Sequence, residues 1–245
     1  MKLKNLLRNL SISLVLPLTL SAHATDTQEI DRSQWDNTFS IVARDPATGA
    51  VGGAVSTARL SVGNRVLQME FGLGAVASQA NTNTELARNA LDQLRKGATA
   101  KEALDAALQA DEKREERQLS VISNKGTQAA FTGTKPDDFK GHIIGKDVVV
   151  AGNILVGRET LEAMVTAFEN TPGPLADRIM TALESGQKAG GDRRGKISAA
   201  IVVLNEAPSS NSYARNIDLR IDSSKDPVGE LRTLFDAYKL AFKIK

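Results

Sequence analysis

The chain contains no cysteine among its 245 residues, and this absence excludes several kinds of chemistry at once. Without a thiol there is no cysteine nucleophile, no disulfide bond and no cysteine-containing metal site, so stability has to come from packing. Histidine is scarce as well, because the only imidazole beyond His23 near the N-terminus belongs to His142. A single histidine makes no convincing Ser-His-Asp site, and a metal would need oxygen ligands alone.

Long apolar runs are missing too, apart from a short one near the N-terminus. Residues 1–24 combine three basic residues, an apolar run at 12–20 and the small-x-small sequence at 22–24. These features are typical of a secretory signal peptide. The apolar run is too short for a permanent membrane anchor. We therefore predict cleavage after Ala24, export to the periplasm or the medium, and no membrane attachment afterwards.

Charge and glycine spacing exclude two further classes of ligand. The chain has 31 basic and 29 acidic residues, and removal of the predicted signal peptide lowers the basic count by three, to 28, for a net charge of −1. That balance does not predict nucleic-acid binding. The glycine-rich stretches at 49–53 and 72–74 lack the G-x-G-x-x-G spacing ahead of a helix, so no dinucleotide site is predicted. We expect no cofactor and no metal.

What the chain does contain is a sharply patterned strand that begins at Thr38. Apolar and more polar residues alternate over Thr38–Asp45, a turn follows at 46–49, and residues 50–56 predict a second strand. The polar residues 25–37 form an extension ahead of it. As a chain terminus, Thr38 would offer a hydroxyl nucleophile and an α-amine with a pKa of about 7.7–8, which suits a general base.

The remainder predicts one domain, residues 38–245, in which strands alternate with pairs of helices. Further strands are expected at 65–70, 74–79, 118–123, 127–132, 147–155, 197–204 and 217–221. Helices are expected around 86–97, 99–110, 161–168, 175–183 and 228–238. This interleaving indicates an α/β fold with two stacked sheets covered by helices on both outer faces.

Four segments of the chain form a recognisable series: Thr38–Asp45 (T-F-S-I-V-A-R-D), Gly74–Ala80, Gly152–Leu155 and Gly190–Gly195, the last carrying G-G-D-x-R-G. In this order they resemble a family of bacterial proteins of unknown function that is assigned to the N-terminal nucleophile (Ntn) hydrolase superfamily. The resemblance covers about residues 38–204. It implies a four-layer αββα sandwich of the Ntn-hydrolase type with a nucleophile at the start of the first strand, which is Thr38. It implies no particular substrate.

The N-terminus departs from the pattern of this family. Family members begin with methionine directly before the threonine, so removal of that methionine exposes the nucleophile. Here, signal cleavage after Ala24 leaves 13 residues ahead of Thr38. Catalysis therefore requires a further cut between Asn37 and Thr38, of the autocatalytic kind made in several branches of the superfamily.

The activating cation departs from the superfamily as well. In the proteasome-like branch an early lysine lowers the pKa of the threonine hydroxyl, but no lysine occurs here between Lys4 and Lys96. Arg59 or Arg65 can supply positive charge, although a guanidinium cannot shuttle a proton. We therefore predict that the amine of Thr38 is the base and that Arg59 stabilises the alkoxide.

Two further residues are candidates for the catalytic step, each with a structural alternative. Asn153 ends a buried strand, where it either aims its amide at an oxyanion or ties down the turn at 152–155. Ser56, like Ser198, either relays a proton near Thr38 or serves as a hydrogen-bonding fixture at a strand end. His142 is interpreted as a surface histidine or as a loop histidine with satisfied hydrogen bonds.

Four residues are candidates for substrate binding. Gln79 and Asn83 close the fourth strand, where polar side chains bind either a substrate or the neighbouring backbone. Asp192 and Arg194 lie in a loop bracketed by glycines. There they form either a structural ion pair or a site in which the arginine fork holds a substrate carboxylate.

Two functions remain open at this point. The first is an exported amidohydrolase that uses Thr38 on a small-molecule or peptide amide. The second is a non-catalytic secreted ligand-binding or assembly protein on the same fold, in which residues 25–37 keep Thr38 blocked. Assembly into a homo-oligomer fits either function.

Overall fold

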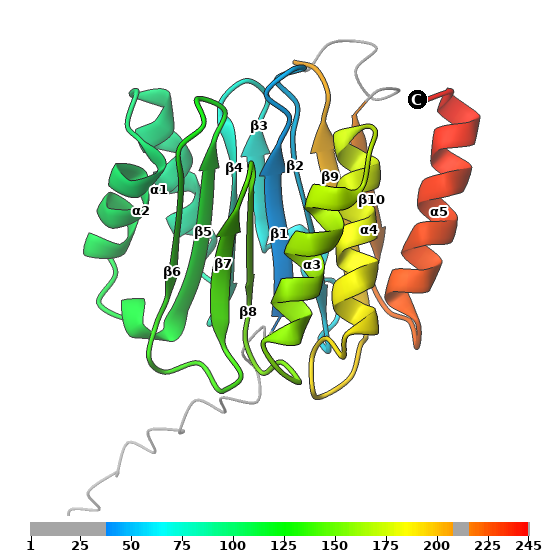
Figure 1. The fold of residues 1–245 in the computed structure, drawn as a ribbon. Helices are drawn as coiled ribbons and strands as arrows, with labels where there is room; N and C mark the ends of the chain where they lie inside the picture. Colours follow the sequence, from blue (N-terminus) through cyan, green and yellow to red (C-terminus); the bar gives the residue numbers. More distant parts are fainter. Residues whose placement is uncertain (1–37, 208–215, 245) are drawn as a thin grey trace, which may run out of the picture. The chain divides into compact units, whose positions relative to one another are not determined.

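The computed structural model describes residues 38–207 and 216–244, all of which belong to one unit, Gln34–Lys245. The predicted signal peptide (1–24) and extension (25–37) lie outside the described residues. Within the described ranges the chain forms ten β-strands and five α-helices (Figure 1). The strands are β1 (Thr38–Arg44), β2 (Val51–Thr57), β3 (Leu67–Glu70), β4 (Gly74–Ala80), β5 (Arg117–Ser123), β6 (Gln128–Thr132), β7 (Gly141–Gly145), β8 (Val148–Gly152), β9 (Ser198–Leu204) and β10 (Ile217–Ile221). The helices are α1 (Thr84–Arg95), α2 (Ala100–Gln109), α3 (Glu159–Asn170), α4 (Leu175–Lys188) and α5 (Pro227–Phe242).

The strands form two antiparallel sheets, so the fold is a mixed α/β fold. The larger sheet has the order β10-β9-β2-β1-β8-β7, and the smaller has the order β3-β4-β5-β6. In the larger sheet β1 lies between β2 and β8, with Phe39 opposite Ser56 on one side and Gly152 on the other. The strand β7 is an addition to the sequence prediction, and it pairs with β8 at the edge of this sheet.

The alternation predicted for β1 divides its side chains between two cores. Phe39 and Ile41 pack in a core that includes residues of α3 and α4. Val42 instead packs in a core with residues of the smaller sheet. Because successive side chains of a strand point to opposite faces, Thr38 and Ser40 share the side of Val42. The start of β1 therefore turns Thr38 toward the smaller sheet.

Helices cover one face of each sheet. Figure 1 shows α1 and α2 beside the smaller sheet, where Leu86 and Leu104 share a core with Val76 of β4. In the larger sheet, α3 contacts β7 and β8, α4 contacts β1 and β2, and α5 contacts β9 and β10. The sheets contact each other through β1 with β4 and through β5 with β8. Side chains at these contacts are enclosed by both sheets.

The two helices that follow β4 begin with side-chain caps. The Oδ1 of Asn83 accepts the backbone N–H of Glu85 at 3.1 Å and caps α1. A capping box begins α2, because the N–H of Thr99 donates to the carboxylate of Glu102 at 2.8 Å and the Thr99 hydroxyl accepts the N–H of Glu102. These caps satisfy N–H groups that the first helical turn leaves without intrahelical partners.

Phe39 anchors the start of β1 in the core beneath α3 and α4. Its ring is fully buried, and Cβ atoms added at Gly186 and Gly191 would lie 3.3 and 3.1 Å from it. We expect Phe39→Ala to lower the free energy of unfolding by about 3–5 kcal/mol, because a large buried ring is replaced by a cavity. Urea unfolding followed by circular dichroism measures the loss. Phe39→Leu is the matched control and should lose clearly less; equal losses would contradict this packing role.

Candidate functional site

The predicted nucleophile, Thr38, is the first residue of β1 and lies where the two sheets meet. Thr38 is completely buried and pairs with Thr57, the last residue of β2. Its carbonyl oxygen accepts the backbone N–H of Asn153 at 3.0 Å and the Nε2 of Gln79 at 3.4 Å. Asn153 directly follows β8, and Gln79 is the penultimate residue of β4. The structure therefore brings together three of the predicted site residues, Thr38, Asn153 and Gln79.

Three buried carboxamides form a connected cluster beside the nucleophile. The Oε1 of Gln118, on β5, accepts the Nε2 of Gln79 at 2.6 Å and the Nδ2 of Asn153 at 2.9 Å. The Nε2 of Gln118 donates to the carbonyl oxygens of Gly141 and Gly152 at 2.9 and 2.8 Å. None of the three side chains belongs to a residue more than 1% exposed. Gln79, Gln118 and Asn153 together constitute the amide cluster.

Several buried oxygen atoms near the amide cluster have no hydrogen-bond partner among the described residues. They are the Oε1 of Gln79, the Oδ1 of Asn153 and the hydroxyl oxygens of Ser40 and Ser120. Ser40 follows Thr38 on the same face of β1, and Ser120 follows Gln118 on the same face of β5. Buried polar atoms normally have a partner in the protein or in ordered water. The two amide oxygens, which belong to the amide cluster itself, therefore remain available to a ligand or to water.

His142 is joined to the amide cluster through Thr132. The Nε2 of Gln118 lies 3.0 Å from the Oγ1 of Thr132, a third acceptor for its two hydrogens, and this Oγ1 lies 2.9 Å from the Nδ1 of His142. The hydrogen of Oγ1 cannot go to an amide nitrogen, so it is directed at the Nδ1 of a neutral imidazole. Burial lowers the pKa of His142, which favours that neutral form. The predicted loop position of His142 is wrong, since the residue lies on β7.

The glycine-bracketed loop contains the ion pair that the sequence offered as one of two alternatives. Asp192 is 3% exposed, and its carboxylate accepts the Nη2 and Nε of Arg194 at 2.6 and 3.1 Å. The Oδ2 of Asp192 also accepts the backbone N–H of Ala58 at 3.2 Å, one residue beyond β2. The carboxylate of Asp192 thus links the loop to the residue that follows β2. Binding of a substrate carboxylate by Arg194 stays a prediction.

Two predicted site residues are separated from the amide cluster. Ser56 pairs with Phe39 and Ala199, whose side chains belong to the core beneath the helices, so Ser56 faces away from the smaller sheet. Thr38 faces the opposite way, and a proton relay between the two side chains would have to cross the sheet. Asn83 caps α1 and accepts a backbone N–H, which is the backbone alternative that the sequence offered.

The two predicted cations have different surroundings. Arg65 donates to the carbonyl oxygens of Ser61 and Leu60 at 2.7 and 2.9 Å, so its guanidinium holds its own loop together. The Nε of Arg59 is buried and has no hydrogen-bond partner among the described residues. The hydroxyl of Ser198 donates to the backbone oxygen of Arg59 at 2.6 Å, as a strand-end fixture would. Of the two arginines, Arg59 is therefore the better candidate for binding an anion.

Sequence reasoning missed Gln118 and Thr132. Both lie on the polar positions of the hairpin β5–β6, and the alternation of polar and apolar residues there is also typical of a strand with one face in water. A glutamine between Arg117 and Leu119, near the start of a predicted strand, was the only signal. The sequence at this position does not show whether the glutamine is buried, because its burial depends on the packing of the second sheet.

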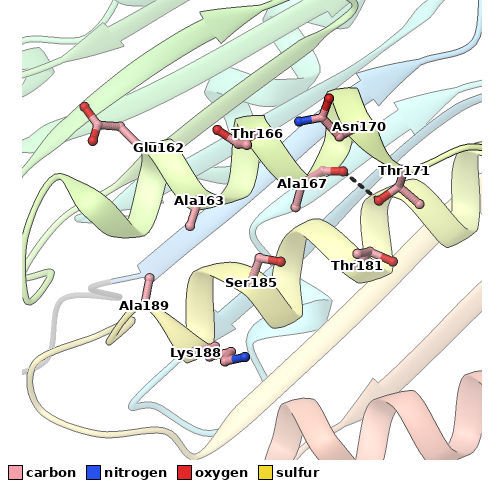
Figure 2. Close-up of a pocket in the computed structure, with 10 residues that line it drawn as sticks. All are labelled: Glu162, Ala163, Thr166, Ala167, Asn170, Thr171, Thr181, Ser185, Lys188 and Ala189. Atoms are coloured by element: carbon pink, nitrogen blue, oxygen red, sulfur yellow. Dashed lines mark hydrogen bonds between the residues drawn. The ribbon is translucent and has the colours of Figure 1, made fainter.

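The described residues offer a depression at another place, between α3 and α4 (Figure 2). It is lined by residues such as Ala163 and Ala167 of α3 and Thr181 and Ser185 of α4, and by none of the predicted site residues. In the part of the chain that the structure describes, no group of three or more histidine, aspartate or glutamate side chains is placed to hold a metal ion. No described helix combines the length and apolar character needed to cross a bilayer.

Two antiparallel sheets in contact, with a buried threonine and an amide cluster where they meet, define this as a mixed α/β protein with an enclosed polar site. The chain belongs to a family described as a family of unknown function (DUF1028), which it matches over residues 38–231. A crystal structure of a DUF1028 protein from Silicibacter pomeroyi is similar, with a TM-score of 0.75 and 35% identity over 83% of this chain and 86% of that one. Anbu (ancestral beta-subunit) from Yersinia bercovieri has a TM-score of 0.37 and 11% identity over 83% of this chain and 96% of that one. None of the curated proteins matches the chain.

The imidazole of His142 provides a titration test of the site. We expect NMR to give it a pKa below the usual value of about 6.5, because burial disfavours the cation. Between the lowered folded value and the unfolded value, the unfolded chain binds more protons. The free energy of unfolding should therefore fall as the pH falls through that window, and be fully present above about pH 6.5. His142→Gln should remove this dependence, and a folded pKa at or above the usual value would contradict the buried neutral imidazole.

Proposed function

We propose that the protein is an exported amidohydrolase of the Ntn-hydrolase type, in which Thr38 becomes the N-terminal residue and acts as the nucleophile. The observation that carries the proposal is the position of Thr38. It opens β1, is fully buried, and has its carbonyl oxygen bound by residues of both sheets. The match to the family begins at the same residue. In this proposal the two sheets and their helices constitute the four-layer αββα sandwich of that superfamily.

The chemistry follows from two groups on one residue. Cleavage of the Asn37–Thr38 bond frees the α-amine of Thr38, whose pKa of about 7.7–8 allows it to take the proton of Oγ as that oxygen attacks an amide carbonyl. When the tetrahedral intermediate collapses, the amine passes the proton to the leaving nitrogen, and the acyl group stays on Oγ as an ester. Water, deprotonated by the same amine, then hydrolyses the ester and restores Thr38.

Asn153 supplies a donor for the oxyanion of the tetrahedral intermediate. One N–H of its Nδ2 is directed at Gln118, and the group has a second N–H to offer. The residue is also fixed by its backbone N–H, which donates to Thr38. Loss of a single oxyanion donor typically lowers kcat by about 10²–10³, so we expect Asn153→Ala to have an effect of that order on amide hydrolysis.

Arg59 supplies the positive charge that lysine supplies in the proteasome-like branch. Its segment continues from Thr57, the residue paired with Thr38, and its buried Nε has no partner among the described residues. A nearby cation stabilises an alkoxide and disfavours protonation of the amine. Ser56 receives no catalytic role in this proposal, because its side chain faces the helices.

The substrate is a small-molecule or peptide amide. The Oε1 of Gln79 is a buried acceptor without a partner among the described residues, and it suits an N–H group of such a substrate. Asp192 and Arg194 hold their loop beside β2 in this proposal, and Asn83 holds the start of α1. Export is a part of the same proposal: the signal peptide is removed after Ala24, and the mature protein acts in the periplasm or the medium.

Reaction with an epoxyketone tests the proposed nucleophile. Such a probe forms a six-membered ring with the hydroxyl and the free α-amine of one residue, and nothing leaves. We expect the exported protein to gain the full mass of the probe, with the adduct on Thr38 by peptide mapping. Thr38→Ser should keep part of the reactivity because it retains both groups, whereas Thr38→Ala should lose it.

Ser40→Ala is the matched control, because it removes another buried hydroxyl from the same face of β1. It should react at the wild-type rate. Labelling that persists in Thr38→Ala would contradict the proposal. A mature chain that begins at Thr38 and stays unlabelled at every pH tested would contradict it as well.

A further inference from the structure

We propose that Gln118 is the positioning residue of this site, which sets the direction of hydrogen bonding for both Asn153 and Gln79. Each of these side chains turns its nitrogen toward Gln118 and keeps its oxygen for another partner. The inference rests on the proposed function for the reaction that it serves, while the hydrogen-bond pattern can be tested without any reaction.

The direction of the Gln118 amide follows from two backbone groups that can only accept. The carbonyl oxygens of Gly141 and Gly152 lie 2.9 and 2.8 Å from its Nε2. These glycines are cross-strand partners at the same end of β7 and β8. An amide oxygen placed against two carbonyl oxygens would be repelled by both, so the side facing them has to be the NH₂ group.

The direction of the other two amides follows from that of Gln118. Its Oε1 is an acceptor, and it is met at 2.6 and 2.9 Å by the terminal amide groups of Gln79 and Asn153. Gln79 and Asn153 must both turn their amide nitrogen toward this Oε1, because an amide oxygen has no hydrogen to donate to it. Their own oxygens are the buried atoms that lack a partner among the described residues.

This polarity decides what the site can bind. With Gln118 in place, the amide cluster offers two fixed oxygens, which accept N–H groups, and the second N–H of Asn153, which suits an oxyanion. A side chain at position 118 without an acceptor would let both amides rotate. Gln79 would then lose its fixed approach to the carbonyl oxygen of Thr38.

Gln118→Leu removes the acceptor and the donors together. We expect hydrogen exchange of the side-chain amides of Gln79 and Asn153, followed by NMR on the uniformly ¹⁵N-labelled mature protein, to become about tenfold faster. The rate of epoxyketone addition to Thr38 should fall by about 10², as expected when reacting groups lose their alignment.

Gln118→Glu keeps the shape and makes the network dependent on pH. A protonated carboxyl group can still accept from the two amides and donate toward the backbone carbonyls, whereas an ionised one has no hydrogen to give them. Burial raises the pKa of the new carboxyl group. Relative to wild type, the variant should keep protected amides at about pH 5 and lose the protection, together with about 10² in addition rate, near pH 8. A purely structural role would change the stability of the variant with pH, but not the protection of these two side-chain amides while the variant stays folded.

Ser120→Ala is the matched control, since it removes a buried hydroxyl two residues along the same face of β5. It should match wild type in both measurements.

The proposal is overturned if Gln118→Leu folds with amide exchange within about twofold of wild type. It is equally overturned if the ratio of Gln118→Glu to wild type does not change with pH, a result that stands even if the leucine variant fails to fold. If wild type does not react with the epoxyketone, the proposed function fails, while amide exchange still decides the role of Gln118.

Discussion

The backbone carbonyl oxygens of Gly141 and Gly152 set the direction of the hydrogen bonds within the amide cluster. They require the nitrogen of Gln118, whose oxygen in turn requires the nitrogens of Gln79 and Asn153. The backbone of β7 and β8 thereby determines how a side chain of β4, in the other sheet, approaches the proposed nucleophile. Because unpaired polar groups are costly in a low-dielectric interior, the loss of one member would leave the groups that it pairs with unsatisfied.

Much of the fold could be predicted because its physical causes are local. The alternation of β1, the capping box at Thr99 and the apolar periodicity of the helices all lie in short stretches of sequence. The strand β7 could not be predicted in this way. Its five residues, Gly-His-Ile-Ile-Gly, show no alternation, and they form a strand because β8 supplies the hydrogen-bond partners.

The candidate site was predictable only in part, because it depends on register and on the approach of the two sheets. Thr38 and Gln79 are polar residues at the ends of predicted strands, so their meeting could be anticipated from the sequence. The prediction that Ser56 relays a proton near Thr38 fails because Thr38 pairs with Thr57. Ser56 is one residue away, so its side chain points to the opposite face of the sheet. Gln118 was missed because a polar position in an alternating strand is the same in sequence whether it faces water or a second sheet.

The central claim is that Thr38 acts as a chain terminus, and the mature protein itself gives the most direct test. The measurement is the intact mass and N-terminal sequence of the protein exported by its native host. We predict a chain that begins at Thr38, with its α-amine free beside its hydroxyl. A chain that begins at Thr25 would leave that amine in a peptide bond and would contradict the account.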